Sequence, residues 1–186
     1  MKLGIDVDGV LARFESGFVR LLHGYTFDLK DPGFPSVWDW PEAAGVPAVL
    51  VHEAWEKVKQ SDLFWYDLVP TPNGRTDIDA LIQARIAGHD IYFITNRMGK
   101  QAKMQTEGWL KLYGYNDPTV LISADKSGCT RALLLDAYID DKPGNLEGHG
   151  LGTQLFLQLA PYNRHLDIPA QRVTCVRQML IQLGIK

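Results

Sequence analysis

The sequence predicts an α/β protein built on a doubly wound parallel sheet. Three observations support this. A short apolar strand opens the chain, apolar runs alternate with helical periodicity from residue 73 onward, and polar residues follow the strands. Strands that alternate with helices are typical of parallel sheets covered on both faces. We therefore expect a Rossmann-like core formed by residues 1–14 and 73–186.

The apolar pattern places the elements of this core. Strands are predicted at residues 3–5, 90–94, 119–122 and 153–157, and within the apolar run 133–139. Helical spacing of apolar residues predicts helices at 78–86 and 102–113 and along the tail 169–183. Gly88 and Gly114 follow the first two helices, and glycine is favoured just after a helix end.

Residues 15–72 separate the first strand from the rest of the core. Helical spacing predicts one helix at 15–23 and another at 47–60. Residues 25–47 contain too many prolines and glycines for a long regular element. We expect residues 15–72 to form a small, mostly helical cap over the carboxyl ends of the strands.

Composition narrows the classes of function. The chain has 186 residues and a formal net charge of −3. That charge offers no attraction for a polynucleotide or an anionic membrane. No apolar run is long enough to span a bilayer and no signal-peptide pattern is present, so we expect a cytoplasmic protein. We expect it to be a monomer or a homodimer. Cys129 and Cys175 lack metal-ligand spacing and are expected to be reduced core thiols.

Polar residues follow the predicted strands at their carboxyl ends. Asp6 and Asp8 share one face of the first strand because alternate strand residues point the same way, and Gly9 then permits a sharp turn. Two carboxylates at the end of a buried strand are costly without a cation. Ligands of open α/β sheets bind at this edge. The polar residues after later strands are Thr95, Asn96, Lys126, Asp140 and Asp141.

Each of these residues, taken alone, has a simpler explanation. Thr95-Asn96 is ordinary turn chemistry, a lone lysine is usually solvated, and two aspartates before Lys-Pro can form a turn or a helix cap. Their occurrence in this order, each at a strand's carboxyl end, is much harder to reach by chance. Together they predict a metal-assisted active site.

These residues resemble the four ordered motifs of the haloacid dehalogenase-like phosphatase superfamily. The motifs are Asp6-Val7-Asp8-Gly9-Val10, Thr95, Lys126 and Asp140-Asp141. The start of the chain and residues 68–74 and 139–143 further resemble the 5′(3′)-deoxyribonucleotidases. The resemblance covers nearly the whole chain outside the cap. Arg13 and Arg97 depart from the nucleotidase pattern near where a substrate would lie, so they leave its identity open.

The resemblance implies a role for each motif residue. Asp6 would attack phosphorus and form an aspartyl-phosphate, while Asp8 would protonate the leaving group and later activate water. Mg²⁺ would be held by Asp6, the backbone carbonyl of Asp8 and Asp140, with Asp141 in support. The phosphate oxygens would be bound by Thr95, the Asn96 backbone N–H and Lys126.

Aromatic residues of the cap favour a nucleotide as substrate. An aromatic ring above a catalytic crevice can stack a nucleobase, which contributes ~1–3 kcal/mol per base. The resembling nucleotidases line their base pocket in this way. Phe14, Trp38 and Trp65 are the candidates here, with Arg97 nearby. The alternative is that most cap aromatics only form the core of the cap, as we expect of Trp55.

We therefore expect a Mg²⁺-dependent 5′-nucleotidase that dephosphorylates nucleoside or deoxynucleoside monophosphates. A second hypothesis keeps the chemistry but assigns a sugar phosphate or another small phosphomonoester as substrate. A third is a catalytically silent phosphate-binding module on the same fold.

Overall fold

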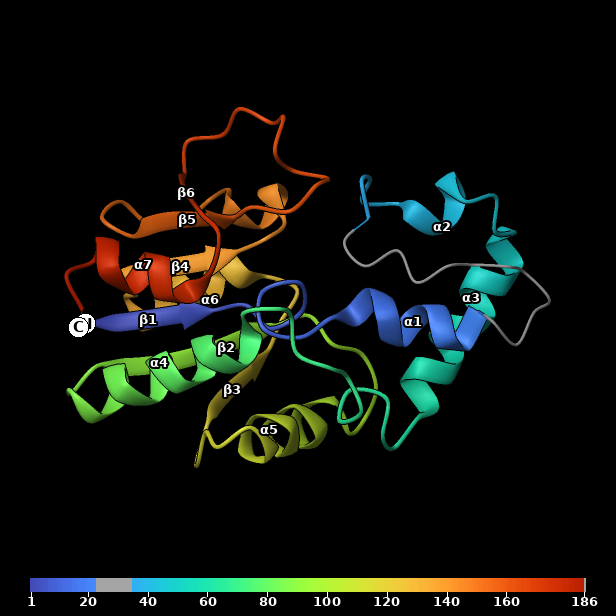
Figure 1. Cartoon of the computed structure of the whole chain (residues 1–186), viewed down its shortest axis with the longest axis horizontal. Helices are drawn as coiled ribbons and strands as arrows, with labels where there is room; N and C mark the ends of the chain where they lie inside the picture. The colour runs from blue at the N-terminus through green and yellow to red at the C-terminus, as the bar shows by residue number, and fades with distance from the viewer. Residues whose placement is uncertain (23–34, 186) are drawn as a thin grey trace.

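The computed structural model describes residues 1–22 and 35–185. At its centre lies a six-stranded, entirely parallel sheet with the strand order β3-β2-β1-β4-β5-β6 (Figure 1). The strands are β1 Lys2–Ile5, β2 Asp90–Thr95, β3 Thr119–Ile122, β4 Ala137–Asp140, β5 Gln154–Gln158 and β6 Gln171–Val173. The predicted α/β class with a parallel sheet is confirmed.

The chain changes direction across the sheet at β1. From β1 it moves outward through β2 to β3, then returns to the other side of β1 and continues through β4 to β6. In the register, Ile5 pairs with both Phe93 of β2 and Ile139 of β4. The carboxyl ends of β1 and β4 therefore meet at a topological switch point, where sheets of this class bind ligands.

Helices cover both faces of the sheet. They are α4 Gly74–Ile86, α5 Ala102–Leu112, α6 Lys126–Leu133 and α7 Val176–Gln182, together with the 3₁₀ helix Pro143–Leu146. Alternate residues of β2 point to opposite faces: Phe93 packs in a large cluster with side chains of α4, α5 and α7, and Ile94 in a smaller one with side chains of α6. The sheet is doubly wound, as the sequence predicts.

One of the predicted core elements differs from the structure. The tail 169–183 is helical only over α7, because residues 171–173 pair with β5 as strand β6. Asp77 of α4 starts α7 by accepting hydrogen bonds from the backbone N–H groups of Val176 and Arg177. The strand predicted within the apolar run 133–139 is β4, which begins at Ala137 because α6 extends to Leu133 and Leu134 adopts a left-handed conformation with φ of 54°.

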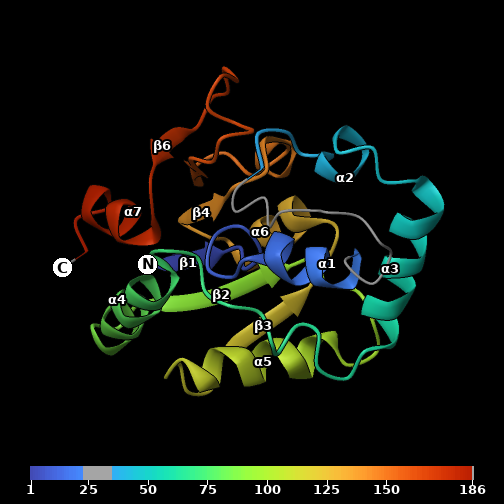
Figure 2. The same ribbon diagram turned by 45° about the vertical axis from the view of Figure 1, so that its right-hand side comes forward.

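In the described part of the chain, three helices between β1 and α4 lie beyond the carboxyl ends of the strands (Figures 1 and 2). They are α1 Phe14–Leu22, α2 Trp40–Ala43 and α3 Ala48–Gln60, and we call them the cap helices. α1 and α3 match the predicted helices 15–23 and 47–60 within a residue among the residues described; residues 23–34 of the expected cap lie outside them. The short α2 falls in a stretch where only brief regular structure was expected.

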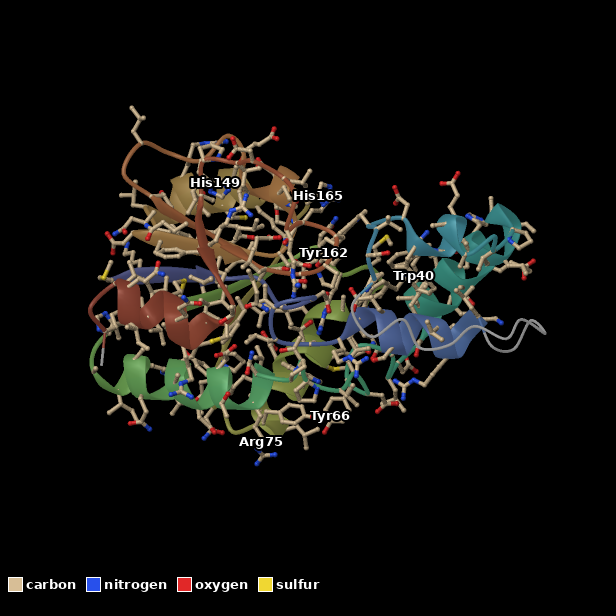
Figure 3. All side chains as sticks on the ribbon, turned by 45° about the horizontal axis from the view of Figure 1, so that its top comes forward. Trp40, Tyr66, Arg75, His149, Tyr162 and His165 are labelled. Carbon is tan, nitrogen blue, oxygen red and sulfur yellow. The ribbon has the colours of Figure 1, made fainter. Side chains whose placement is uncertain are left out.

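Aromatic rings join the cap helices to each other and to the core. Phe14 and Phe18 of α1 lie 5.2 and 4.8 Å from the Trp55 ring of α3, measured between ring centroids. In Figure 3, Tyr162 of the core lies on the side that faces Trp40 and the cap helices. Over residues 1–22 and 35–185, no helix combines the length and apolar character needed to cross a membrane.

Candidate active site

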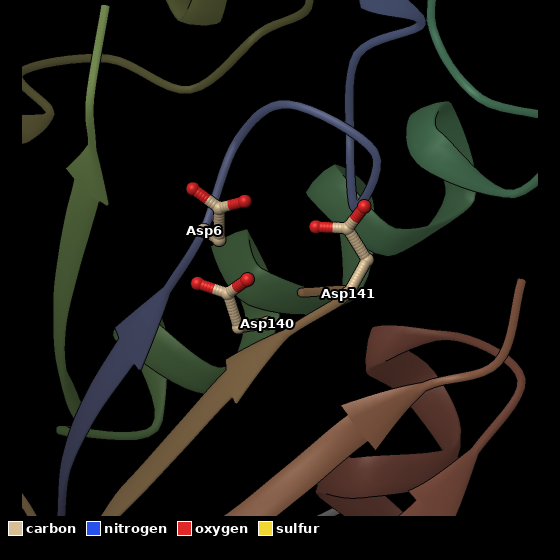
Figure 4. A group of neighbouring side chains, drawn as sticks. All are labelled: Asp6, Asp140 and Asp141. Atoms are coloured by element: carbon tan, nitrogen blue, oxygen red, sulfur yellow. The ribbon is translucent and has the colours of Figure 1, made fainter. Parts of the chain in front are cut away.

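Three aspartates converge at the switch point of the sheet. Asp6 directly follows β1, Asp140 ends β4, and Asp141 comes next in the chain. All three are buried, and one carboxylate oxygen of each lies within 4.8 Å of the others. Figure 4 shows the three carboxylates gathered at the ends of these two strands. The structure thus brings together the opening acidic residue and the later Asp-Asp pair.

Lys126 is the cation among these carboxylates. Its Nζ donates to Asp6 Oδ1 and to Asp140 Oδ2, each at 2.7 Å. Burial alone disfavours the ammonium, but the adjacent carboxylates raise the pKa of Lys126 above its ordinary value. Asp125, the residue before it, starts α6 by accepting a hydrogen bond from the backbone N–H of Gly128 and so fixes where the lysine side chain begins.

The acidic cluster carries more negative charge than Lys126 can balance. Burial raises the pKa of Asp6 to about 7, against the attraction of Lys126 and with added repulsion from Asp140 and Asp8. Burial and the repulsion of Asp140 and Asp6 hold the pKa of Asp141 well above its usual range. Three buried carboxylates facing one ammonium are the setting in which a divalent cation is stabilised, and carboxylate oxygens are the ligands that Mg²⁺ prefers.

Asp140 has both of its oxygens occupied by donors of the protein itself. Its Oδ1 accepts from the Lys142 backbone N–H at 2.8 Å and from Asn145 Nδ2 at 3.1 Å. Its Oδ2 accepts from Lys126, from the Tyr138 hydroxyl at 2.6 Å and from Asn145. Five donor contacts on one carboxylate leave few lone pairs for a metal ion.

Asp141 is held differently. Its Oδ2 accepts a hydrogen bond from the Tyr162 hydroxyl, and its backbone carbonyl accepts from Asn163 Nδ2 at 2.7 Å. Gly9 lies against the same carboxylate, with φ of +82°, and a Cβ there would be 2.1 Å from Asp141 Oδ2. Asp141 lines the cavity above the site, whereas Asp140 does not.

Tyr162 and Asn163 are residues of this site that the sequence motifs do not predict. Both lie in the segment after β5, at the same edge of the sheet as the aspartates. The signal that could have found them is their position after a strand's carboxyl end, the criterion that identified the other site residues.

Asp8 is bound by Thr95 and Arg97. Its carboxylate accepts from the Thr95 hydroxyl at 3.2 Å and from Arg97 Nε and Nη2 at 3.0 and 2.8 Å. Arg97 was expected near the substrate as a binding residue, but it lies behind Asp8 and is not among the residues that line the cavity. The surface of the cavity at this point is formed by Asp8, Thr95 and Asn96.

A cavity of 760 Å³ separates these residues from the cap helices. Asp6, Asp8, Lys126 and Asp141 line it at the ends of the strands. The cap side contributes the three aromatic residues selected from the sequence and also Trp55, which both packs in the cap and lines the cavity. Phe18 of α1 lines it as well, so the aromatic lining residues on this side are Phe14, Phe18, Trp38, Trp55 and Trp65.

Trp38 lines this cavity and also contacts residues of the core. Its side chain is 45% exposed, and its ring lies 4.6 Å from Lys142 Nζ and 5.3 Å, edge to face, from the Tyr162 ring. Trp38 therefore connects the cap to the segment that positions Asp141.

Comparison with known proteins gives one curated relative of similar length. The chain is 25% identical over 187 aligned positions to a protein of Oceanobacillus iheyensis named "Putative nucleotidase", and the match covers 89% of this chain and 90% of the relative. No family model matches the chain.

Several solved structures share the fold at low sequence identity. The L-2-haloacid dehalogenase of Xanthobacter autotrophicus superposes with a TM-score of 0.60 at 12% identity, covering 100% of this chain and 99% of the dehalogenase. A protein of Bacillus subtilis described as a "putative HAD-hydrolase" and solved with bound magnesium superposes with a TM-score of 0.59 at 13% identity, covering 99% of this chain and 98% of that protein. The chain therefore has the haloacid dehalogenase-like fold of these structures, and its sequence resembles that of the relative named "Putative nucleotidase".

Proposed function

We propose that this protein is a Mg²⁺-dependent phosphomonoester hydrolase, and that its substrates are nucleoside monophosphates. The observation that carries the proposal is the buried cluster of Asp6, Asp140, Asp141 and Lys126 at the floor of an aromatic-lined cavity. The haloacid dehalogenase-like fold and the resemblance to a nucleotidase support it.

The donor set fits a hard divalent cation. Asp6 and the backbone carbonyl of Asp8 would supply two oxygen ligands. For the third we propose Asp141 rather than Asp140, because protein donors occupy both oxygens of Asp140 while Asp141 lines the cavity. In this assignment Asp141 is the ligand and Asp140 the supporting residue, the reverse of what the sequence resemblance implies. When bound, the ion would neutralise the carboxylates and polarise a phosphate oxygen.

The remaining residues suit phosphoryl transfer in two steps. Asp6 attacks phosphorus, and the new Asp6–phosphorus bond forms as the bond to the leaving oxygen breaks. Asp8 gives its proton to that oxygen, so the alcohol departs neutral. Asp8 then takes a proton from a water molecule that attacks phosphorus, which releases inorganic phosphate and restores Asp6 and the protonated Asp8. Lys126, Thr95 and the Asn96 backbone N–H would bind the phosphate oxygens.

The lining of the cavity favours a leaving group that carries a flat aromatic base. Its cap side is lined by the rings of Phe14, Trp38, Trp55 and Trp65, and rings of this kind stack nucleobases independently of base identity. A sugar phosphate would engage the same aspartates and Lys126 but would leave most of this aromatic surface without a partner.

A phosphate-release assay tests the proposal. The purified protein is given pyrimidine and purine nucleoside monophosphates and several sugar phosphates, with Mg²⁺ or with EDTA, and Asp6→Asn serves as the inactive control. We expect Mg²⁺-dependent release that is fastest from nucleotides. Equal rates on all esters would refute base recognition, and no release with Mg²⁺ would refute phosphatase activity.

A further inference from the structure

Arg97 has a fully buried guanidinium whose three nitrogens all bind fixed protein groups. Nε and Nη2 form a fork on the two oxygens of Asp8, at 3.0 and 2.8 Å. Nη1 donates to the Thr106 hydroxyl of α5 at 3.0 Å, and that hydroxyl in turn donates to the Ala102 carbonyl at 2.7 Å. A two-point contact between guanidinium and carboxylate fixes the plane of the carboxylate as well as its distance.

Trp65 holds the guanidinium from the cavity side. The guanidinium carbon lies 4.9 Å from the centre of the Trp65 ring. The ring N–H donates to the Met98 carbonyl and the backbone N–H to Gln105 Oε1, both at 2.9 Å. Trp65 is buried and also lines the cavity. Arg97 is therefore fixed between α5 and a ring of the cavity wall, with Asp8 at its tip.

We propose that Arg97 is a positioning residue that acts through Asp8. It holds the Asp8 carboxyl group in the orientation from which it exchanges a proton with the leaving oxygen. Without Arg97, the side-chain hydrogen bond that Asp8 keeps within residues 1–22 and 35–185 is the one from Thr95 at 3.2 Å. This inference rests on the proposed function, because it takes Asp8 to be the acid of a phosphate-ester hydrolase.

A positioning role for Arg97 predicts a difference between substrates that a purely structural role would not produce. The leaving alkoxide of a nucleoside is strongly basic and needs the proton of Asp8 as its bond to phosphorus breaks. p-Nitrophenolate is weakly basic and departs without one. Loss of Arg97 should therefore slow the nucleotide far more than p-nitrophenyl phosphate. The parameter to compare is kcat/KM, since it includes the steps up to leaving-group departure and excludes hydrolysis of the phosphoenzyme.

The experiment measures kcat/KM on both substrates for the wild type and for Arg97→Met, Asp8→Asn and the double variant. For Arg97→Met we expect a loss of ~10²-fold on the nucleotide and under ~10-fold on p-nitrophenyl phosphate, within the range that general acids contribute. The double variant should be no slower than Asp8→Asn, because residues that act through one another are not additive.

Two further variants keep the result interpretable. Arg97→Lys retains a buried cation but cannot form the fork, so it should show the same substrate pattern in weaker form even if Arg97→Met folds poorly. Arg85→Met removes another arginine that stacks on an aromatic ring, 5.5 Å from the Tyr115 ring centre, and should change neither rate.

Equal losses on the two substrates, or additive losses in the double variant, would overturn the role of Arg97 while leaving the proposed function intact. A wild type that hydrolyses neither ester would overturn both. A selective loss on the nucleotide, absent from the Asp8→Asn background, supports the inference.

Discussion

Replacing Gly9 by alanine tests the packing that places Asp141. Gly9 has φ of +82°, a region that costs an L-residue ~1–2 kcal/mol. Its added Cβ would also lie 2.1 Å from Asp141 Oδ2, so that carboxylate must move away from its place beside Asp6. We expect Gly9→Ala to lower the free energy of unfolding by at least ~1–2 kcal/mol and to weaken Mg²⁺ binding by more than ~10-fold.

Gly88→Ala is the matched control. Gly88 has a similar φ of +93°, but a Cβ there meets nothing within 4 Å. It should show the backbone loss alone, a fall of ~1–2 kcal/mol in the free energy of unfolding. Urea unfolding measures stability for both variants, and calorimetric titration with Mg²⁺ or Mn²⁺ measures affinity. If Gly9→Ala binds the metal as tightly as Gly88→Ala, the reasoning that Asp141 packed against Gly9 supplies a metal ligand is wrong.

Three other predictions follow from the same contacts. Tyr162→Phe removes the hydroxyl that donates to Asp141 and should weaken Mn²⁺ binding, measured by calorimetry, ~10–100-fold. Tyr115→Phe changes another buried tyrosine and should leave the affinity unchanged. Equal Mn²⁺ affinities of the two variants would contradict the positioning of Asp141 by Tyr162. Because the folded pKa of Asp6 is raised from 3.8 to about 7, the folded metal-free protein binds more protons than the unfolded chain over this range. The unfolding free energy of EDTA-treated protein should therefore fall as pH rises from about 4 to 7, and it should fall more steeply than that of the Asp6→Asn variant. Equal slopes for the two proteins would show that Asp6 does not have a raised pKa in the folded state. Asp77→Ala leaves the backbone N–H groups of Val176 and Arg177 without their acceptor and should lower the free energy of unfolding by ~1–3 kcal/mol, with the metal affinity unchanged. Asp79 is exposed on the same helix, so Asp79→Ala should change neither quantity.

The sequence was sufficient to predict the fold class and most of the residues at the floor of the cavity. Their signals are local: Asp6 and Asp8 follow an apolar strand, and Asp140 and Asp141 end another apolar run. Parallel strands place their carboxyl ends at one edge, so local signals suffice to gather these residues in space.

Other features depend on contacts between distant segments and could not be predicted in this way. Asp140 and Asp141 are identical neighbours in the sequence, and they differ in the structure because Lys126, Tyr138 and Asn145 converge on Asp140. Arg97 looked like a substrate contact because of its place after Thr95-Asn96, yet its guanidinium points to Asp8.

The strand β6 is a similar case. The helical spacing of the tail correctly predicts α7. The three residues of β6 form a strand instead, because they pair with β5, and this tertiary contact outweighs the local pattern. The length of a helix at the end of a chain is set partly by which neighbouring edge remains open for pairing.

The central claim is that Asp6 attacks phosphorus within a site completed by a divalent cation. It is tested most directly by acid-quenching the protein during turnover of a nucleoside monophosphate with Mg²⁺, reducing it with borohydride and mapping the modified peptide by mass spectrometry. The account predicts that Asp6 alone is converted to homoserine, and that EDTA or Asp6→Asn abolishes the product. Rapid phosphate release with an unmodified Asp6, or modification at another carboxylate, would contradict it.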